Sequence, residues 1–162
     1  MMKAFTKRRY HGFGQFWREL RAVWRDRREL RGILKGRTLD PKFRERIMLA
    51  ITAVNQCRYC SFAHTRIALR EGLRREEIDG FFQGRLEEAP DADRAAILYA
   101  QHWAEKDGAP DADMVDRLRA EYGEETAARI NATLRMMRLN NLTGNTIDWF
   151  LHTVSFGLLG GA

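Results

Sequence analysis

The sequence predicts a single all-α domain, a helical bundle of about seven helices. Apolar residues recur every three or four positions through most of the 162 residues, which is the spacing of amphipathic helices. The alternation of period two that indicates strands is absent. With 44% hydrophobic residues and only three prolines, the chain can bury one sizeable core and is too short for two ordinary domains.

Four helices are expected in the first half of the chain. The first covers residues 14–34 and has a stripe of large apolar side chains with arginines on its other faces. That stripe consists of Phe13, Phe16, Trp17, Leu20, Val23, Trp24 and Leu30. Asp40-Pro41, a capping residue followed by proline, opens a second helix over residues 41–55. The third runs over residues 57–71 and ends at Gly72, and a short fourth helix covers residues 75–82.

Three further helices are expected in the second half. One spans residues 91–106 and is ended by the turn residues 107–110. The next covers residues 111–122 and stops at Gly123, and the last runs from residue 124 to about residue 156, with Gly144 expected to interrupt it. This last helix carries an unusual polar cluster of Asn131, Asn140, Asn141, Thr143 and Asn145. We favour a structural use, bonding backbone carbonyls at the bend, over contact with an active site.

The net charge of +6 is concentrated at the start of the chain. Residues 1–37 contain twelve lysines and arginines against three acidic residues, so we divide the chain into a basic amphipathic arm, 1–37, and a core domain, 38–162. Packing against a neighbouring subunit is the favoured role of the arm. An anionic membrane surface is an alternative. Nucleic-acid binding is the least favoured role because no helix-turn-helix or zinc-finger pattern is present.

Both cysteines and one of the four histidines lie in the run Cys57-Arg58-Tyr59-Cys60-Ser61-Phe62-Ala63-His64. In a helix, residues three and four positions apart lie on one face, so Cys57, Cys60 and His64 share a stripe. The cysteines would lie in the first turn, where free N–H groups and the helix dipole favour a thiolate. A thiolate with a second thiol one turn away predicts redox chemistry through a disulfide.

His64 can accept a proton from a thiol and return it to a leaving group, provided that another side chain fixes its tautomer. Glu45 is the candidate for that role. It lies one expected helix earlier, and a hairpin of the two helices would bring its carboxylate towards His64 directly or through one water.

These residues form a larger pattern. It consists of Glu45, Cys57-x-x-Cys60-x-x-x-His64, a helix ending at Gly72 and the acidic start of a short helix, Arg75-Glu76-Glu77-Ile78. The pattern resembles the alkylhydroperoxidase D-like branch of the carboxymuconolactone decarboxylase family. The resemblance covers residues 41–82 well and residues 95–100 and the asparagine-rich last helix more loosely.

The resemblance implies a thiol-dependent oxidoreductase, a peroxidase or protein disulfide reductase. Cys60 would attack the hydroperoxide or disulfide substrate, Cys57 would resolve the product, and His64 and Glu45 would relay protons. It also implies a homo-oligomer, a trimer or hexamer, with no tightly bound cofactor and with an external dithiol donor, either a lipoylated or a thioredoxin-like protein. Tyr59 stands where the best-known peroxidase member has a second histidine, which would weaken peroxide turnover. Lactone decarboxylation is not expected, because members with that activity lack the cysteine pair.

Other interpretations of the motif stay open. The cysteines could be small buried hydrophobic residues, or could bind zinc, although Cys57, Cys60 and His64 supply three ligands where a closed site needs four. A non-catalytic redox sensor or oligomeric scaffold is the alternative function. His11, His102 and His152 have no partner pattern.

A cytoplasmic location is expected, because the cysteine spacing cannot join distant segments and no secretory signal is evident. The longest apolar stretch, residues 146–162, is interrupted by Asp148 and His152, so no transmembrane helix is expected.

Overall fold

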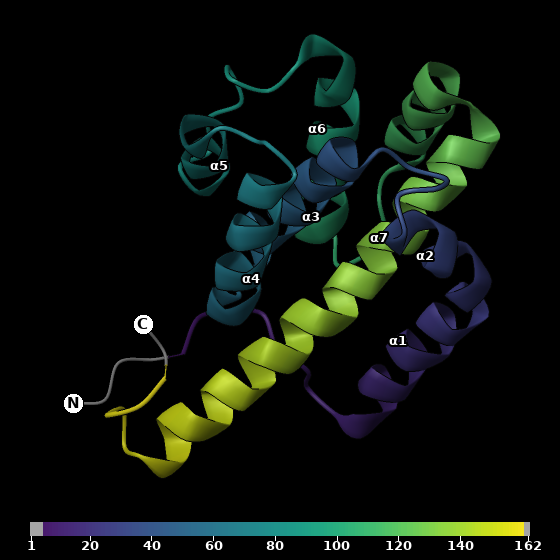
Figure 1. Ribbon diagram of the computed structural model, residues 1–162. Helices are drawn as coiled ribbons and strands as arrows, with labels where there is room; N and C mark the ends of the chain where they lie inside the picture. The colour runs from purple at the N-terminus through teal and green to yellow at the C-terminus, as the bar shows by residue number, and fades with distance from the viewer. Residues whose placement is uncertain (1–4, 161–162) are drawn as a thin grey trace.

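A computed structural model describes residues 5–160, and within that range the protein is entirely helical, as predicted (Figure 1). Its seven helices are α1 (Phe13–Arg25), α2 (Arg27–Leu34), α3 (Pro41–Asn55), α4 (Arg58–Arg70), α5 (Arg75–Phe82), α6 (Asp91–Glu105) and α7 (Ala112–Val154). None of the helices in the described range is long and apolar enough to cross a bilayer.

Helix α3 is the centre of the core. It packs against α4, α5, α6 and α7, and the run from Ile47 to Thr52 is fully buried. The Asp40 carboxylate caps its start by accepting a hydrogen bond from the Phe43 N–H, and Pro41 occupies the first turn. Because the middle of α3 is enclosed on all sides, a polar residue buried there must find a partner inside the protein.

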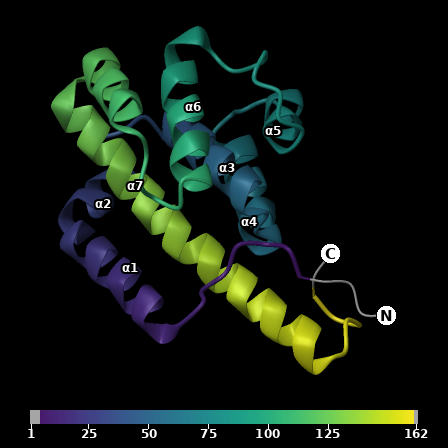
Figure 2. The ribbon, with the colours of Figure 1, turned by 180° about the vertical axis from the view of Figure 1, so that it is seen from behind.

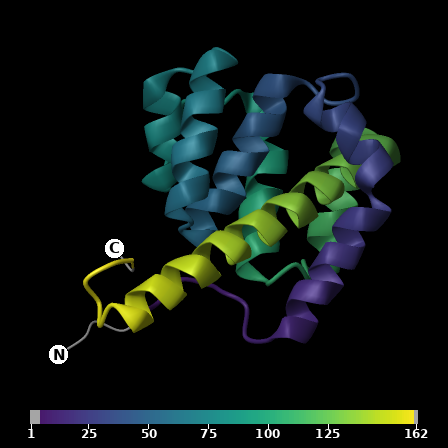
Figure 3. The ribbon, with the colours of Figure 1, turned by 60° about the horizontal axis from the view of Figure 1, so that its bottom comes forward.

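The long helix α7 crosses the whole molecule, with α1 and α2 on one side and α3 and α4 on the other (Figures 1 and 2). Figure 3 shows α1 lying along the edge of the molecule, beside α7. The basic arm therefore packs against the rest of its own chain through these two helices.

The helix predicted over residues 14–34 is two helices. The chain leaves helical geometry at Asp26 (φ −83°, ψ 0°), where α1 ends and α2 begins. No glycine or proline marks this position. The Asp26 carboxylate pairs with Arg135 of α7 at 2.6 Å, so a contact from a distant part of the chain accompanies the break.

The two helices predicted after residue 110 are continuous in α7 except at Gly123, whose backbone is non-helical (φ 77°, ψ 162°). The stop predicted at Gly123 is therefore a bend between two helical segments. The interruption expected at Gly144 is wrong, because α7 runs through this glycine without a break. Gly144 has a packing role, described below.

The turn between α3 and α4 sets the geometry of the motif. Gln56 takes the left-handed conformation (φ 55°, ψ 36°) at the end of α3, and Cys57 already caps the start of α4. The reversal therefore takes two residues, which folds α4 back along α3. Side chains on the facing sides of α3 and α4 are brought within contact distance.

Candidate functional site

Cys57 and Cys60 form the start of α4. Cys57 is the N-terminal capping residue, and its Sγ accepts a hydrogen bond from the Cys60 N–H at 3.3 Å. Cys57 is fully buried, whereas Cys60 is partly exposed. Both cysteines have free thiols. Of the two sulfur atoms, that of Cys60 is the one a substrate can reach.

A hydrogen bond between the two thiols lowers the pKa of one and raises the pKa of the other. The Cys60 thiol stabilises a Cys57 thiolate and, against the effect of burial, lowers the pKa of Cys57 to about 7, with smaller contributions from backbone N–H groups and Lys7. The same contact raises the pKa of Cys60, and burial raises it further. The pair therefore loses its first proton near neutral pH, and Cys57 is the more acidic of the two thiols.

Glu45 and His64 meet as predicted. The Glu45 carboxylate, fully buried on α3, lies 2.8 Å from His64 Nδ1 on α4. Its other oxygen accepts a hydrogen bond at 3.0 Å from Arg44, a residue that the sequence did not single out. Arg44 also donates to the carbonyls of Ile33 and Leu34 at the end of α2. The contact fixes the ring orientation and leaves Nε2 of His64 for other partners.

One asparagine of α7, Asn141, reaches the cysteine helix, so the purely structural use favoured for the polar cluster is wrong for this residue. Asn141 hydrogen-bonds Cys60 and lowers its pKa, which opposes the larger effects of Cys57 and burial. The Asn141 side chain also bonds Asn55 at 3.1 Å and Thr52 at 3.3 Å. Asn145 donates to the carbonyls of Asn55 and Arg8, both at 2.7 Å. Asn141 and Asn145 tie the end of α3 to α7.

Gly144 lets α7 approach the cysteines. A Cβ at this position would lie 2.8 Å from Cys57 Sγ and 3.9 Å from Cys60 Sγ. Beside it is an open hollow of about 440 Å³ that contains both Cys60 and His64. Its lining residues are Tyr59, Cys60, Ala63, His64, Asn140, Thr143, Gly144 and Ile147. The reactive groups therefore share a space large enough for a small organic substrate.

A second charged cluster lies one turn further along α7. The buried Asp148 pairs with Lys7 at 3.0 Å and with Arg58 at 2.7 Å. Arg58 also donates to the Tyr59 hydroxyl at 2.8 Å. Lys7 belongs to the segment before α1, which lies across α7 because Tyr10 N–H donates to Thr146 Oγ1 at 3.1 Å. The start of the chain thus places a cation near the cysteine pair.

All four predicted site residues, Glu45, Cys57, Cys60 and His64, lie in this region, and sequence reasoning missed the residues around them. Arg44 could have been suspected from its position beside Glu45, and Gly144 from its place in a polar run. Asn141 belongs to the polar cluster that the sequence shows, although a structural use was favoured for it, whereas Lys7 and Asp148 carry no local signal of a site. His102 lies elsewhere, accepting a bond from Asp111 N–H at 3.2 Å.

Across residues 5–160, no group of three or more histidine, cysteine, aspartate or glutamate side chains could hold a metal ion. Among family models, that of the carboxymuconolactone decarboxylase family matches the chain over residues 19–106. This range holds the four predicted site residues and begins inside α1. No curated protein and no solved structure matches the chain.

Proposed function

The chain belongs to the carboxymuconolactone decarboxylase family, and from this premise we propose that it is a thiol-dependent oxidoreductase that reduces hydroperoxides or protein disulfides through Cys57 and Cys60. The observation that carries the proposal is the Glu45–His64 contact at 2.8 Å, in the same small region as two free thiols. A buried carboxylate that orients a histidine beside a partly exposed thiol supplies a nucleophile and a proton carrier together.

In the first step with a hydroperoxide, Cys60 is the attacking residue because it lines the hollow while Cys57 is buried. Its thiol proton passes to Nε2 of His64. The Cys60 sulfur then attacks the terminal oxygen of the peroxide, so that an S–O bond forms and the O–O bond breaks. The departing alkoxide takes the proton from His64 and leaves as an alcohol, while Cys60 is oxidised to a sulfenic acid.

In the second step, the Cys57 thiolate attacks the sulfur of the Cys60 sulfenic acid. An S–S bond forms, the S–O bond breaks, and hydroxide leaves with a proton as water. An external dithiol then attacks the accessible Cys60 sulfur and displaces Cys57 as a thiolate, which leaves a mixed disulfide between Cys60 and the donor. The second thiol of the donor attacks the donor's own sulfur in that mixed disulfide, so the Cys60 thiol is released and the donor leaves as a disulfide. The lowered pKa of Cys57, about 7, supports this role, because a more acidic thiol is a better leaving group.

The first test is a stopped-flow measurement on the reduced protein with hydrogen peroxide, cumene hydroperoxide and a lipoamide disulfide. Tryptophan fluorescence and free thiols are followed together. We expect two thiols per chain to be lost far faster than in free cysteine with at least one of these oxidants. Slow loss with all three would contradict the proposal and would favour the redox-sensor or scaffold function.

Substitution of each cysteine assigns the steps. We expect Cys60→Ser to abolish turnover, and Cys57→Ser to stop after one oxidation, with a sulfenic acid that a dimedone adduct reveals by mass spectrometry. Both variants keep the size of the side chain. Full activity in both single variants would rule out this mechanism.

A further inference from the structure

The charges of α1 and α2 are sorted between two faces. The three acidic side chains point to α7, where Glu19 pairs with Arg138 at 2.7 Å, Asp26 with Arg135 at 2.6 Å and Glu29 with Arg129 at 2.7 Å. All three negative charges therefore lie on the side of these helices that faces α7, and none lies on the outer face, which points away from α7.

The outer face of the same helices carries basic side chains. Arg18, Arg21, Arg25 and Arg28 are exposed, and within residues 5–160 none of them has a carboxylate within 4.0 Å. On the helical repeat, Arg18, Arg21 and Arg25 lie three and four positions apart, so they form one strip along α1. This strip is a concentrated positive charge that no carboxylate among residues 5–160 neutralises through an ion pair.

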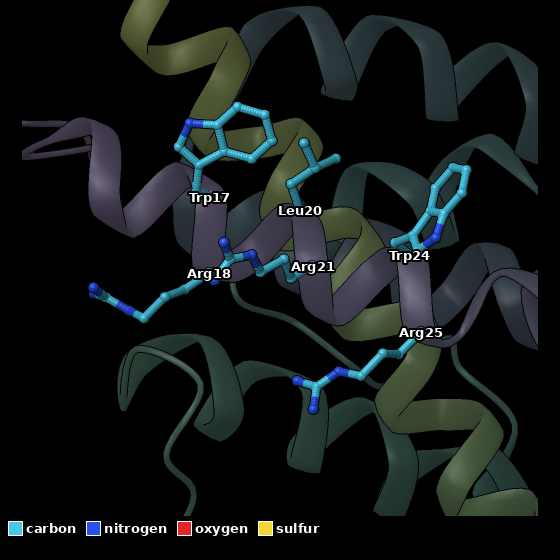
Figure 4. A pocket seen from close by; sticks show the side chains of 6 residues that line it. All are labelled: Trp17, Arg18, Leu20, Arg21, Trp24 and Arg25. Carbon is cyan, nitrogen blue, oxygen red and sulfur yellow. The ribbon is translucent and has the colours of Figure 1, made fainter.

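An apolar strip lies beside it on the same helix. Phe13, Trp17 and Trp24 are 72%, 44% and 65% exposed, far more than large aromatic residues in a packed core. Figure 4 shows Trp17, Leu20 and Trp24 in one row along α1 and Arg18, Arg21 and Arg25 in a neighbouring row. Between them is an open hollow of about 780 Å³.

We propose that this face of α1 binds the surface of a membrane containing anionic phospholipids, with the helix parallel to the bilayer plane. Exposed tryptophan and phenylalanine prefer the boundary between headgroups and acyl chains, and flanking arginines bind lipid phosphates. The two strips run side by side along α1, so one orientation satisfies both. The proposal concerns a surface separate from the cysteine site.

The charge distribution favours an anionic membrane over two other partners, a second copy of the chain and a nucleic-acid duplex. A second copy placed face to face would bring arginine strip against arginine strip, with no carboxylate between them. The phosphates of a nucleic-acid duplex would contact the basic strip and would leave the apolar strip in water. An anionic membrane matches both strips.

The test uses the full chain and large unilamellar vesicles of phosphatidylcholine, either alone or with roughly 30% phosphatidylglycerol. We expect cosedimentation with the anionic vesicles that weakens as salt is raised, and little with the neutral ones. Lipids brominated on their acyl chains should quench the fluorescence of Trp17 and Trp24. Equal binding to both kinds of vesicle, or none to either, would overturn the proposal.

Two variants test the face itself. We expect the triple variant R18Q/R21Q/R25Q to lose about a hundredfold in affinity for anionic vesicles. Trp24→Ala should lose about tenfold and should fold normally, because its ring is exposed and contacts the Arg27 guanidinium. Circular dichroism checks folding in each case.

The matched control is R74Q/R75Q/R94Q, which removes the same charge from exposed arginines paired with Glu88, Asp79 and Asp91. We expect it to bind almost normally. An equal loss in the control would show that only net charge matters and would overturn the proposal. So would a duplex DNA that binds more tightly than the vesicles, or an oligomer that the Trp24→Ala variant dissociates in the absence of lipid.

Discussion

At the scale of single residues, the charges around His64 form a chain from Arg44 through Glu45 to the ring. Arg44 and Glu45 are almost fully buried, and a buried charge is stable only when it is paired and hydrogen-bonded. The two carbonyls at the end of α2 accept the remaining hydrogen bonds of the Arg44 guanidinium. The orientation of His64 therefore depends on α2 as well as on α3.

His64→Gln tests the proton carrier. Glutamine can donate its side-chain N–H to the Glu45 carboxylate but cannot exchange a proton near neutral pH, so we expect the rate of peroxide or disulfide reduction to fall by about 10²- to 10⁴-fold. The measurement is the rate of thiol loss in stopped flow. His102→Gln, remote from the cysteines, is the control and should keep the wild-type rate. A loss below about threefold in His64→Gln would count against proton transfer.

Lys7→Met tests the cation supplied by the start of the chain. The positive charge of Lys7 helps to lower the pKa of Cys57, so its removal should raise that pKa above about 7. The ultraviolet absorbance of the thiolate, followed against pH, should show its midpoint moving upwards, with less thiolate at neutral pH.

Arg58 still pairs with Asp148 in this variant, so the fold should be retained. Lys7→Arg should restore the midpoint, and Lys35→Met, at an exposed lysine, should leave it unchanged. An unmoved midpoint in Lys7→Met would show that Lys7 acts only as a structural partner of Asp148.

At the scale of elements, the close approach of α7 to the start of α4 depends on Gly144. Glycine inside a helix is destabilising by about 1 kcal/mol relative to alanine, so its presence here needs a packing reason. The 2.8 Å contact that a Cβ would make with Cys57 Sγ supplies that reason.

Gly144→Ala should therefore destabilise the protein, by about 1–3 kcal/mol, because the helix must shift or the thiol must move. Gly14→Ala is the matched control, since its Cβ would meet nothing closer than Arg18 at 3.9 Å. That variant should gain up to about 1 kcal/mol. Urea unfolding measures both, and a Gly144→Ala variant as stable as Gly14→Ala would contradict the packing argument.

At the scale of the whole molecule, large apolar side chains remain exposed beside the cysteine site. Ile147, Phe150 and Val154 lie three and four positions apart on α7 and are each more than half exposed, and Phe62 of α4 is also exposed. Ile147 lines the hollow that contains Cys60. An apolar stripe of this kind is typical of an interface between subunits.

We expect the protein to be a homo-oligomer, a trimer or hexamer, that uses this stripe. Phe150→Asp should then lower the mass measured by light scattering, because burying the charged aspartate in the interface would remove its hydration and destabilise the oligomer. Phe82→Asp, at an exposed phenylalanine of α5, is the control and should keep the mass of the wild type. A monomeric wild-type protein would contradict the prediction.

The helical class, most helix boundaries and the four motif residues follow from the sequence alone. Apolar periodicity, the Asp40-Pro41 start and the glycine stop at Gly72 are local signals, and local signals determine local structure. The break at Asp26 and the continuity of α7 through Gly144 could not be predicted from local signals, because each depends on which residues pack against the helix.

The sequence by itself determined that two thiols and a histidine share one helical face, and that a carboxylate lies on the preceding helix. Only the tertiary structure decided that Glu45 contacts His64 directly, that Asn141 reaches Cys60, and that the acidic side chains of α1 and α2 turn inwards. The physical reason is that contacts between residues about 20 to 140 positions apart depend on how helices pack, and packing is a property of the whole core.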